Sequence, residues 1–560
     1  MPLSRLLEGL DGIIRVMTPD GTGDCAGPAG GFSRDPAVTA LAFHSAQVMP
    51  GALFVAIRGS HRDGHDFVDE ALLRGAHAVV VDRPEVARRL SCGPRPCVAV
   101  EVRDSRLALA RLATRWFGEP SRELAVVGVT GTVGKTSTAL FLRQLLEACG
   151  RTTGAIGSLG VFLGSVRVPS RLTTPDPLTL QGWLRAMADE RLWAAIVEVS
   201  SHALLQHRAS GVRLRAGALT DLVPHEHTDT HPTFADYLAA KRRFLELLAD
   251  DAPLVYSAAS PATVQLAQRW PAPQRVRYGL TAEVLERAGP ADADPPGEEA
   301  GWVYGRVLGA DLGGTWLEVR AVARARPQGS TGVPGRDGGR AQAGPGRVRF
   351  GPVRVRLGLL GLHSAANAVG AVAAAFALGL EWDPLMAAVE RLRPLRRRME
   401  VIYRGPFTAI DDTTGHPASF ERLFEVLEAA GSGPLVLVVG VRGSRGSDAN
   451  ARNGRVIARW SRRLAVRKVV VTSSEEAAGP ADRVLPQERE ALITCLRGGP
   501  APVLHCPTLQ EALQAALDST RPGDVLVLAG AQGLDRAASV FRRLMGLDAH
   551  PEPDPFPTAG

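Results

Sequence analysis

A glycine-rich segment at residues 124–150 constrains the fold more than any other part of the chain. An apolar run, Leu-Ala-Val-Val-Gly-Val, leads into Gly-Thr-Val-Gly-Lys-Thr at 131–136, and apolar residues then recur at helical spacing until Gly150. Strand, glycine loop and helix in this order are typical of a phosphate-binding loop, in which backbone N–H groups and the positive end of the helix approach phosphate oxygens. The segment therefore predicts a nucleotide-binding α/β domain.

Individual loop residues have distinct expected roles. Lys135 can reach the terminal phosphates, and the hydroxyl of Thr136 or Ser137 can hold Mg²⁺. Val129 stands where the general motif has its first glycine, so a glycine-rich turn without a ligand is the alternative. The nucleotide-binding residues predicted from the loop are Gly131, Thr132, Gly134, Lys135, Thr136 and Ser137.

Composition narrows the class of protein. The 560 residues suggest about three or four domains, and 45% hydrophobic with 22% charged residues is ordinary for a globular protein. No run reaches the ~20 apolar residues of a membrane span, and the first eleven residues carry acids where a signal peptide is apolar. The net charge of +7 is spread along the chain instead of forming a basic stripe. We expect a cytoplasmic monomer without membrane insertion or nucleic-acid binding.

Six cysteines form no Cys-x-x-Cys pair, which argues against disulfide frameworks and zinc sites. Only three of the 65 Lys and Arg residues are lysines, at 135, 241 and 468, and only three asparagines occur, at 367, 450 and 453. Arginine replaces lysine wherever either serves, so the remaining lysines mark sites that need a compact or deprotonatable amine.

Alternating strand and helix patterns predict three α/β units. Residues 1–121 form a small first unit, 122–393 a central unit with a doubly wound sheet, and 394–547 a third unit. Residues 284–350 are partly a low-complexity insertion, with residues 323–351 expected to be exposed to solvent, and residues 548–560 are expected to be a disordered tail.

Three further segments of the central unit carry candidate chemistry. The apolar run at 192–197 ends at Glu198, and a carboxylate at the C-terminal end of such a strand faces the ligand crevice of a doubly wound sheet. Residues 225–231 are dense in histidine and acid and are either a metal or substrate site or a polar loop. A predicted helix over 234–248 places Lys241 on its apolar face, where burial lowers the pKa of a lysine. A structural carboxylate and a snorkelling lysine remain the alternatives.

Five segments in order resemble the Mur ligases. They are the loop at 131–136, Thr-Thr-Pro-Asp-Pro from residue 173, Glu-Val-Ser-Ser-His from 198, the His and acid run ending at His231, and Ala-Ala-Lys at 239–241. More narrowly, they resemble the branch that adds the third residue to the peptidoglycan stem peptide. Asp-Gly-His at 63–65 and Arg-Met-Glu at 398–400 extend the resemblance to the outer units. It implies an N-terminal UDP-sugar-binding domain, a central ATP-binding domain and a Rossmann-like C-terminal ligase domain.

The resemblance also implies a reaction and its residues. ATP would activate a substrate carboxylate as an acyl phosphate, from which an amino acid displaces phosphate, with UDP-muramoyl-dipeptide and an amino acid as substrates and ATP and Mg²⁺ as cofactors. The implied catalytic residues are Lys135, Glu198, His227 and Lys241, of which Glu198, His227 and a carbamylated Lys241, together with Thr136, would hold metal. The implied nucleotide contacts are Asn367, Arg398 and Asp412, and the implied substrate contacts are Ser45, Thr173, Thr174, Ser200, Gln206 and Arg208.

Departures from the family pattern concentrate in the third unit. The family's Asp-Ser-Arg is His-Ser-Ala at 44–46, and the usual loop asparagine is Val133. The segment that selects diaminopimelate is missing near 471–474, and Lys-Gly-His-Glu is replaced at 531–534. We therefore expect an acceptor amino acid other than diaminopimelate in its usual binding mode. The alternatives are a relative acting on another carboxylate, such as a poly-γ-glutamyl acid, and a non-catalytic nucleotide-binding paralogue.

Overall fold

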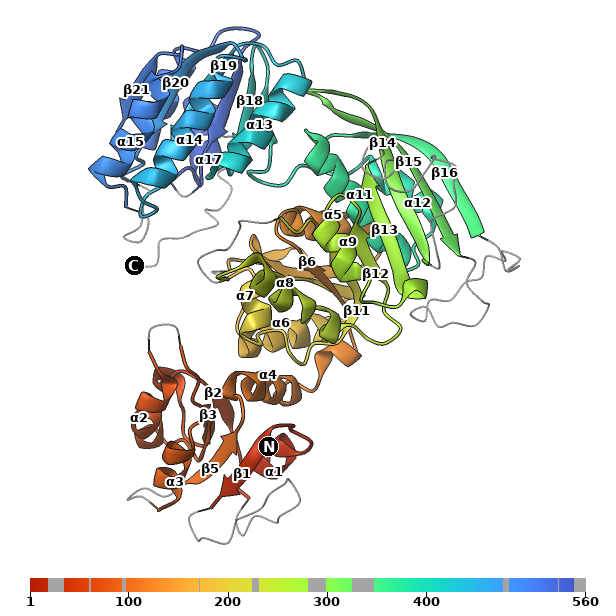
Figure 1. Cartoon of the computed structure of the whole chain (residues 1–560), viewed down its shortest axis with the longest axis vertical. Helices are drawn as coiled ribbons and strands as arrows, with labels where there is room; N and C mark the ends of the chain where they lie inside the picture. Colours follow the sequence, from red (N-terminus) through yellow and green to blue (C-terminus); the bar gives the residue numbers. More distant parts are fainter. Residues whose placement is uncertain are drawn as a thin grey trace.

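The computed structural model contains three α/β domains that follow one another along the long axis of the molecule (Figure 1). It describes residues 1–18, 35–59, 62–92, 97–170, 172–223, 231–280, 299–324, 347–476, 483–531 and 533–547. The predicted three-domain α/β architecture is confirmed, with the three sheets contained in residues 13–102, 125–357 and 400–529. The exact domain limits remain a prediction.

The N-terminal domain is built on a five-stranded sheet in the order β1-β5-β4-β3-β2. Strand β1 is antiparallel to β5 and the other neighbours are parallel. Strands β3 and β4 are buried along their whole length, as expected of parallel strands covered on both faces. The elements are β1 Ile13–Met17, β2 Ala40–Ala42, β3 Ala52–Val55, β4 Ala78–Val81, β5 Val98–Val102, α1 Leu3–Leu7, α2 Val68–Leu73, α3 Pro84–Cys92 and α4 Ser105–Trp116.

The middle domain carries an eleven-stranded sheet in the order β16-β15-β14-β13-β12-β11-β6-β10-β7-β8-β9. The strands from β14 to β7 run parallel, and antiparallel strands extend both edges. The strands are β6 Ala125–Thr130, β7 Thr153–Gly157, β8 Gly160–Leu163, β9 Val166–Val168, β10 Ala194–Glu198, β11 Leu214–Leu219, β12 Leu254–Ser257, β13 Arg275–Leu280, β14 Gly301–Asp311, β15 Gly314–Arg324 and β16 Arg347–Leu357. Because β6 lies between β10 and β11, the strand order reverses beside it, and ligands bind at such a switch point.

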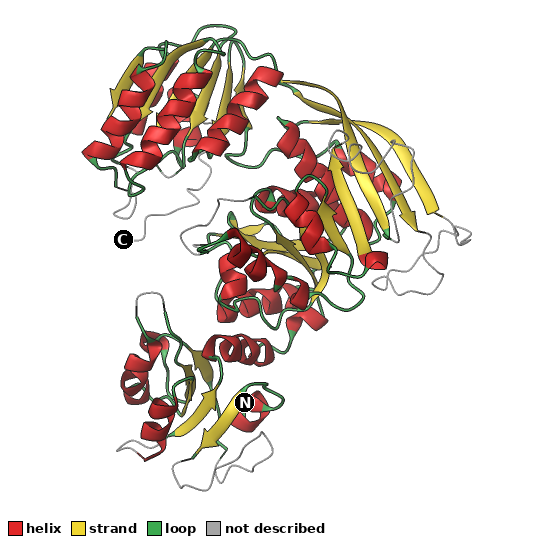
Figure 2. Ribbon diagram, viewed as in Figure 1, coloured by secondary structure: helices red, strands yellow, loops and turns green. Residues whose placement is uncertain are grey.

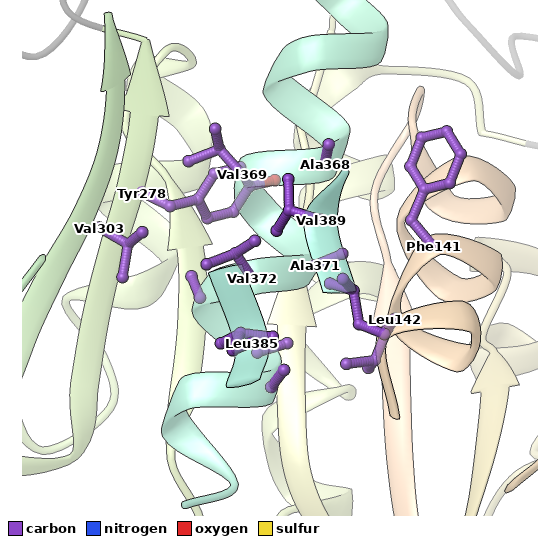
Figure 3. Packing of buried hydrophobic residues seen from close by; sticks show 14 of the residues in the cluster. Phe141, Leu142, Tyr278, Val303, Ala368, Val369, Ala371, Val372, Leu385 and Val389 are labelled. Atoms are coloured by element: carbon purple, nitrogen blue, oxygen red, sulfur yellow. The ribbon is translucent and has the colours of Figure 1, made fainter. Parts of the chain in front are cut away.

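Helices cover both faces of the middle sheet (Figure 2). One face carries α5 Lys135–Ala148, α11 Leu362–Ala377 and α12 Trp382–Val389, and the other carries α6 Pro177–Asp189, α7 Ser201–Leu205, α8 Phe234–Arg242 and α9 Pro261–Ala267. The alanine-rich helix α11 lies beside α5 on the same face of the sheet. Its valines point toward Tyr278 and Val303, and its alanines toward α5 (Figure 3). Small residues on that side let the two helices pack closely, which positions the start of α5 against α11.

Two expected segments differ in the structure. The helix predicted over 234–248 ends at Arg242, and a 3₁₀ turn follows at Leu245–Leu247. The helix stops because the chain must join the sheet: Leu248 bridges Leu214 at the start of β11, and the Ala249 N–H donates to the Leu214 carbonyl. Within the predicted insertion, residues 301–324 form the long strands β14 and β15, and residues 347–351 begin β16. The low-complexity residues between them, 325–346, lie outside the described residues, as does the tail at 548–560.

The C-terminal domain is a six-stranded sheet in the order β17-β18-β22-β19-β20-β21, in which β17 alone is antiparallel to its neighbour. Helices α13 to α15 cover one face and α16 and α17 the other. The elements are β17 Glu400–Arg404, β18 Thr408–Asp412, β19 Leu435–Gly440, β20 Val466–Thr472, β21 Val503–Cys506, β22 Val525–Ala529, α13 Pro417–Ala429, α14 Ser447–Trp460, α15 Pro486–Arg497, α16 Leu509–Leu517 and α17 Ala537–Leu544. Across the described parts of all three domains, every helix is too short or too polar to span a bilayer.

Replacing Leu385 with alanine should destabilise the middle domain. The side chain is 0% exposed between α12 and the sheet, so its removal leaves a cavity and should lower the free energy of unfolding by about 2–5 kcal/mol. Leu362→Ala on α11, where the leucine is 53% exposed, is the matched control and should change that free energy by less than about 0.5 kcal/mol. Urea unfolding followed by tryptophan fluorescence measures both, and equal losses would contradict this core assignment.

Candidate active site

The phosphate loop between β6 and α5 depends on two glycines. A Cβ on Gly131 would lie 1.9 Å from the Thr220 hydroxyl oxygen, so no side chain fits there. Gly134 has φ 86°, in the left-handed region, and a Cβ on it would lie 2.4 Å from the side-chain oxygen of Asn367. The loop thus fits between the end of β11 and helix α11 only because both positions lack side chains.

The end of β11 also braces the loop through hydrogen bonds. The Thr220 hydroxyl donates to the Val133 carbonyl at 2.6 Å, and the Thr132 N–H donates to the Asp221 carbonyl at 2.8 Å. Val133 therefore serves the loop through its backbone carbonyl, a contact that does not depend on the side chain at this position. The Thr132 hydroxyl lies 2.7 Å from the Tyr237 hydroxyl, which connects the loop to α8.

The reactive end of the loop lies beside Glu198. The Thr136 hydroxyl donates to a Glu198 carboxylate oxygen at 2.8 Å, so the carboxylate at the end of β10 is in direct contact with the hydroxyl at the start of α5. Ser137 lies in the same helical turn, but the contact is made by Thr136, which favours Thr136 as the metal-binding hydroxyl. The Lys135 ammonium donates to the carbonyls of Gly131 and Thr132 at 3.0 and 2.7 Å, and so lies over the loop itself.

Glu198 is 2% exposed, and burial raises the pKa of its carboxyl above the usual value. The Thr136 hydrogen bond, the positive charge of Lys135 and the Ser158 N–H at 2.9 Å act in the opposite direction and favour the carboxylate. The side chain is therefore held by two donors, the Thr136 hydroxyl in the first turn of α5 and the Ser158 N–H directly after β7.

Lys241 lies beneath the loop, as predicted from the helical face. It is 1% exposed, and its ammonium donates to the Thr130 hydroxyl at 2.8 Å and to the Gly131 carbonyl at 3.0 Å. No acid forms an ion pair with it among the residues that the structure describes. Burial, and secondarily the charge of Lys135, lower its pKa well below the usual lysine value. The site thus contains an amine that releases its proton easily.

Five of the predicted substrate contacts form a second cluster next to Glu198. The Thr174 hydroxyl donates to the Glu198 carbonyl at 2.7 Å and accepts the Ser200 N–H at 3.0 Å. The Arg208 guanidinium donates to the Thr174 carbonyl at 3.0 Å and to the Gln206 side-chain oxygen at 2.8 Å. The Thr173 hydroxyl lies 2.9 Å from that of Ser158, which itself donates a backbone N–H to Glu198. Hydrogen bonds therefore connect the end of β10, the segment at residues 173–174 and the residues that flank α7.

The remaining predicted residues lie in three places. Asn367 on α11 contacts the start of α5, where the Thr138 hydroxyl donates to it at 3.4 Å. Arg398 and Asp412 lie at the entry to the C-terminal domain, and the charge of Arg398 is close enough to act against the burial that raises the pKa of Glu198. Ser45 begins a 3₁₀ turn, Ser45–Gln47, in the N-terminal domain. His227 lies outside the described residues.

Hydroxyl and carboxylate oxygens are the ligands that Mg²⁺ prefers, and Thr136 and Glu198 present both at a distance of 2.8 Å from each other. This pair therefore fits the predicted metal. The described residues contain no group of three or more His, Cys, Asp or Glu side chains arranged for a metal.

Three residues of the site were not predicted from the sequence. Thr130 accepts a hydrogen bond from Lys241, Ser158 donates one to Glu198, and Thr220 braces the loop. Thr130 ends β6, Ser158 follows β7 next to β10, and Thr220 follows β11 next to β6. The strand-end rule that identified Glu198 could have found them had the strand order been known.

Models of the Mur ligase family match three segments of the chain. They are described as "Mur ligase family, catalytic domain" for residues 37–116, "Mur ligase middle domain" for 129–299, and "Mur ligase, glutamate ligase domain" for 397–532. The UDP-N-acetylmuramyl-tripeptide synthetase of Roseiflexus sp. (strain RS-1) is 32% identical over 509 residues, which are 89% of this chain and 90% of the relative.

Solved structures show the same fold. A UDP-N-acetylmuramoyl-L-alanyl-D-glutamate–2,6-diaminopimelate ligase matches with a TM-score of 0.58 at 20% identity, covering 91% of this chain and 95% of its own. The Mycobacterium tuberculosis folylpolyglutamate synthase complexed with ADP and AMPPCP matches with a TM-score of 0.55 at 18% identity, covering 79% of this chain and 95% of its own.

Replacing Gly131 with alanine should weaken the binding of magnesium–ATP by at least about tenfold, because the added Cβ would displace the loop from Thr220. Gly309→Ala is the control, since a Cβ at this strand position meets nothing within 4 Å. Fluorescence titration with a labelled ATP analogue gives the dissociation constants. An unchanged constant for Gly131→Ala would show that this loop does not bind the phosphates.

Proposed function

The chain belongs to the Mur ligase family, and on this premise we propose that it is an ATP-dependent ligase that joins an amino acid to a UDP-N-acetylmuramoyl-dipeptide. The observation that carries the proposal is the convergence of Lys135, Glu198 and Lys241 around one phosphate loop at the switch point of the sheet. That arrangement combines phosphate binding, a carboxylate next to a hydroxyl, and a deprotonatable amine.

The proposed reaction has two steps. A carboxylate oxygen of the dipeptide attacks the γ-phosphorus of ATP, ADP leaves, and an acyl phosphate forms. The neutral amino group of the incoming amino acid then attacks the acyl carbon, phosphate leaves, and an amide remains. Phosphoryl transfer depends mainly on positioning and on stabilising negative charge. The loop N–H groups, the N-terminus of α5 and the Lys135 ammonium supply that stabilisation.

Mg²⁺ would neutralise phosphate charge and polarise the transferred group. Thr136 would hold one ion at the triphosphate, and Glu198 and His227 would hold a second. The contact between the Thr136 hydroxyl and the Glu198 carboxylate, at 2.8 Å, supports placing both residues at the metal-binding part of the site.

Lys241 is proposed to carry a carbamate. Its lowered pKa leaves the amine neutral more readily than in an exposed lysine, and a neutral amine can add to CO₂ with release of one proton. The product is an anion beneath the loop, close to Thr130 and Gly131, where it can support the metal. Arginine cannot form this group, which explains why a chain so poor in lysine keeps one here.

Substrate contacts are proposed on both sides of Glu198. Thr173, Thr174, Ser200, Gln206 and Arg208 would bind the muramoyl-dipeptide, and the Arg208 guanidinium suits its acidic groups. Ser45 would contact the UDP end in the N-terminal domain. Asn367, Arg398 and Asp412 would contact the nucleotide. We further propose that the protein acts as a cytoplasmic monomer.

A second candidate function is ligation to a different carboxylate, such as a poly-γ-glutamyl acid. The folylpolyglutamate synthase with the same fold and the His-Ser-Ala segment at 44–46 favour it. A non-catalytic nucleotide-binding protein is less well supported, because Lys135, Glu198 and Lys241 are all kept.

Phosphate release from ATP distinguishes these functions. We expect release with UDP-muramoyl-dipeptide and at least one amino acid from a panel that includes diaminopimelate, lysine, and neutral amino acids, with diaminopimelate not the preferred acceptor. Mass spectrometry should detect the matching amide. Turnover only with a γ-glutamyl acid would favour the second candidate, and ATP binding without turnover on any acid would favour the non-catalytic one.

Lys241→Arg is expected to reduce ligation by at least about a thousandfold while magnesium–ATP still binds, because the guanidinium cannot be carbamylated. Lys468→Arg is the matched control: Lys468 on β20 donates to Ser519, which follows α16 in the C-terminal domain, and its replacement should leave turnover within about twofold. Normal turnover of Lys241→Arg would remove the carbamate from the mechanism.

A further inference from the structure

The connection between the middle and C-terminal domains contains two residues with an unfavourable backbone. Arg397 has φ 56° and Met399 has φ 51°, both in the left-handed region that residues other than glycine rarely adopt. Such conformations persist only where the surrounding contacts determine them. Arg398, the predicted nucleotide contact, is the single residue between the two.

Contacts from the C-terminal domain hold this backbone in place. The Arg397 N–H donates to the Glu400 carboxylate at 2.9 Å, and the Arg397 carbonyl accepts both the N–H and the hydroxyl of Thr413, each at 2.9 Å. The Met399 N–H donates to the Asp412 carboxylate at 2.8 Å. The residues on both sides of Arg398 are therefore attached to β17 and to the end of β18.

The side chain of Arg397 adds a third attachment. The residue is 6% exposed, and its Nε donates to the Asp411 carboxylate at 3.3 Å. One terminal nitrogen pairs with Asp535, and the other donates to the carbonyls of Gly530 and Ala531. The guanidinium thus joins the end of β18 to the segment after β22. That segment lies more than 130 residues after Arg397 in the chain.

Arg398 differs from Arg397 in its exposure to solvent. It is exposed, and its backbone lies between two residues that are both attached to the C-terminal domain. Its positive charge acts against the burial that raises the pKa of Glu198 in the middle domain and that of Asp412 at the end of β18. The buried Arg397 and the exposed Arg398 belong to one strained connection, so fixing the first fixes the backbone that carries the second.

We propose that Arg397 is a positioning residue, whose buried guanidinium holds the interdomain connection in the left-handed conformation that directs Arg398 toward the nucleotide. The inference rests on the proposed function, in which Arg398 contacts ATP. It assigns to Arg397 no contact with substrate or with the reacting atoms.

Arg397→Gly tests this directly, because glycine accepts the left-handed backbone but cannot make the side-chain contacts. We expect the KM for ATP to rise about tenfold, while the KM for UDP-muramoyl-dipeptide, which the other two domains bind, changes by less than about twofold. Arg397→Lys should be intermediate, since lysine keeps the charge but not the planar set of donors. The dissociation constant of Mg²⁺-bound β,γ-imido-ATP, measured by calorimetry, should follow the same order.

Arg191→Gly is the matched control, because Arg191 is also an arginine at φ 54°, but exposed at the end of α6. It should leave both KM values unchanged. Asp535→Asn keeps Arg397 and removes an ion pair to a half-exposed carboxylate, so it should raise the KM for ATP in the same direction but less. If Arg397→Gly does not fold, the KM for ATP of Asp535→Asn tests the same proposal.

Two results would overturn the proposal. One is an unchanged KM for ATP and an unchanged imido-ATP constant in the Arg397 variants. The other is a lower melting temperature with reduced kcat and no change in either KM, which would mean that Arg397 only stabilises the fold. Absence of amide formation by the unsubstituted chain would instead contradict the proposed function, while the imido-ATP constants would still compare the variants.

Discussion

The hydrogen bond between Thr136 and Glu198 is the contact on which the site depends. It joins the first turn of α5 to the end of β10, and it forms because β10 pairs in register with β6, which carries the loop. Space for the carboxylate is kept by Gly157 on β7, where a Cβ would lie 1.9 Å from a Glu198 oxygen. Three adjacent strand ends thus place one carboxylate against one hydroxyl, and the phosphate chemistry follows from that position.

Burial of charge is the second constraint. A lysine without an ion-pair partner among the described residues is costly to keep charged in a site that excludes water, and the cost is reduced when the amine loses its proton. Lys241 is held by a hydroxyl and a carbonyl, which are weaker partners than a carboxylate. The environment that makes the lysine unfavourable as a cation is the one that makes it reactive as an amine.

Local patterns in the sequence were sufficient for the central elements. The glycine spacing predicted β6, the loop and α5, the strand-end rule predicted the position of Glu198, and helical periodicity predicted that Lys241 points inward. The three asparagines of a chain that otherwise avoids this residue each support a loop or helix start: Asn367 contacts α5, Asn450 holds the Arg442 carbonyl, and Asn453 holds that of Gly415.

Long-range pairing set the limit of prediction. Thr220 and Ser158 act on the site only because β11 and β7 lie where they do, and no local pattern encodes strand order. The contacts of Arg397 join parts of the chain 138 residues apart, and the end of α8 at Arg242 is set by the pairing of Leu248 with β11. No reason for a valine at position 133 followed from the sequence, and the contact that the structure shows there is made by the backbone carbonyl.

In the proposed reaction, ATP activates a substrate carboxylate as an acyl phosphate at this loop. The most direct test uses UDP-muramoyl-dipeptide with ¹⁸O in its reacting carboxylate, together with ATP and the accepted amino acid. Mass spectrometry of the released phosphate should find one ¹⁸O atom per turnover, because the bridging oxygen of the acyl phosphate leaves with phosphorus. Amide formation with unlabelled phosphate would contradict the account.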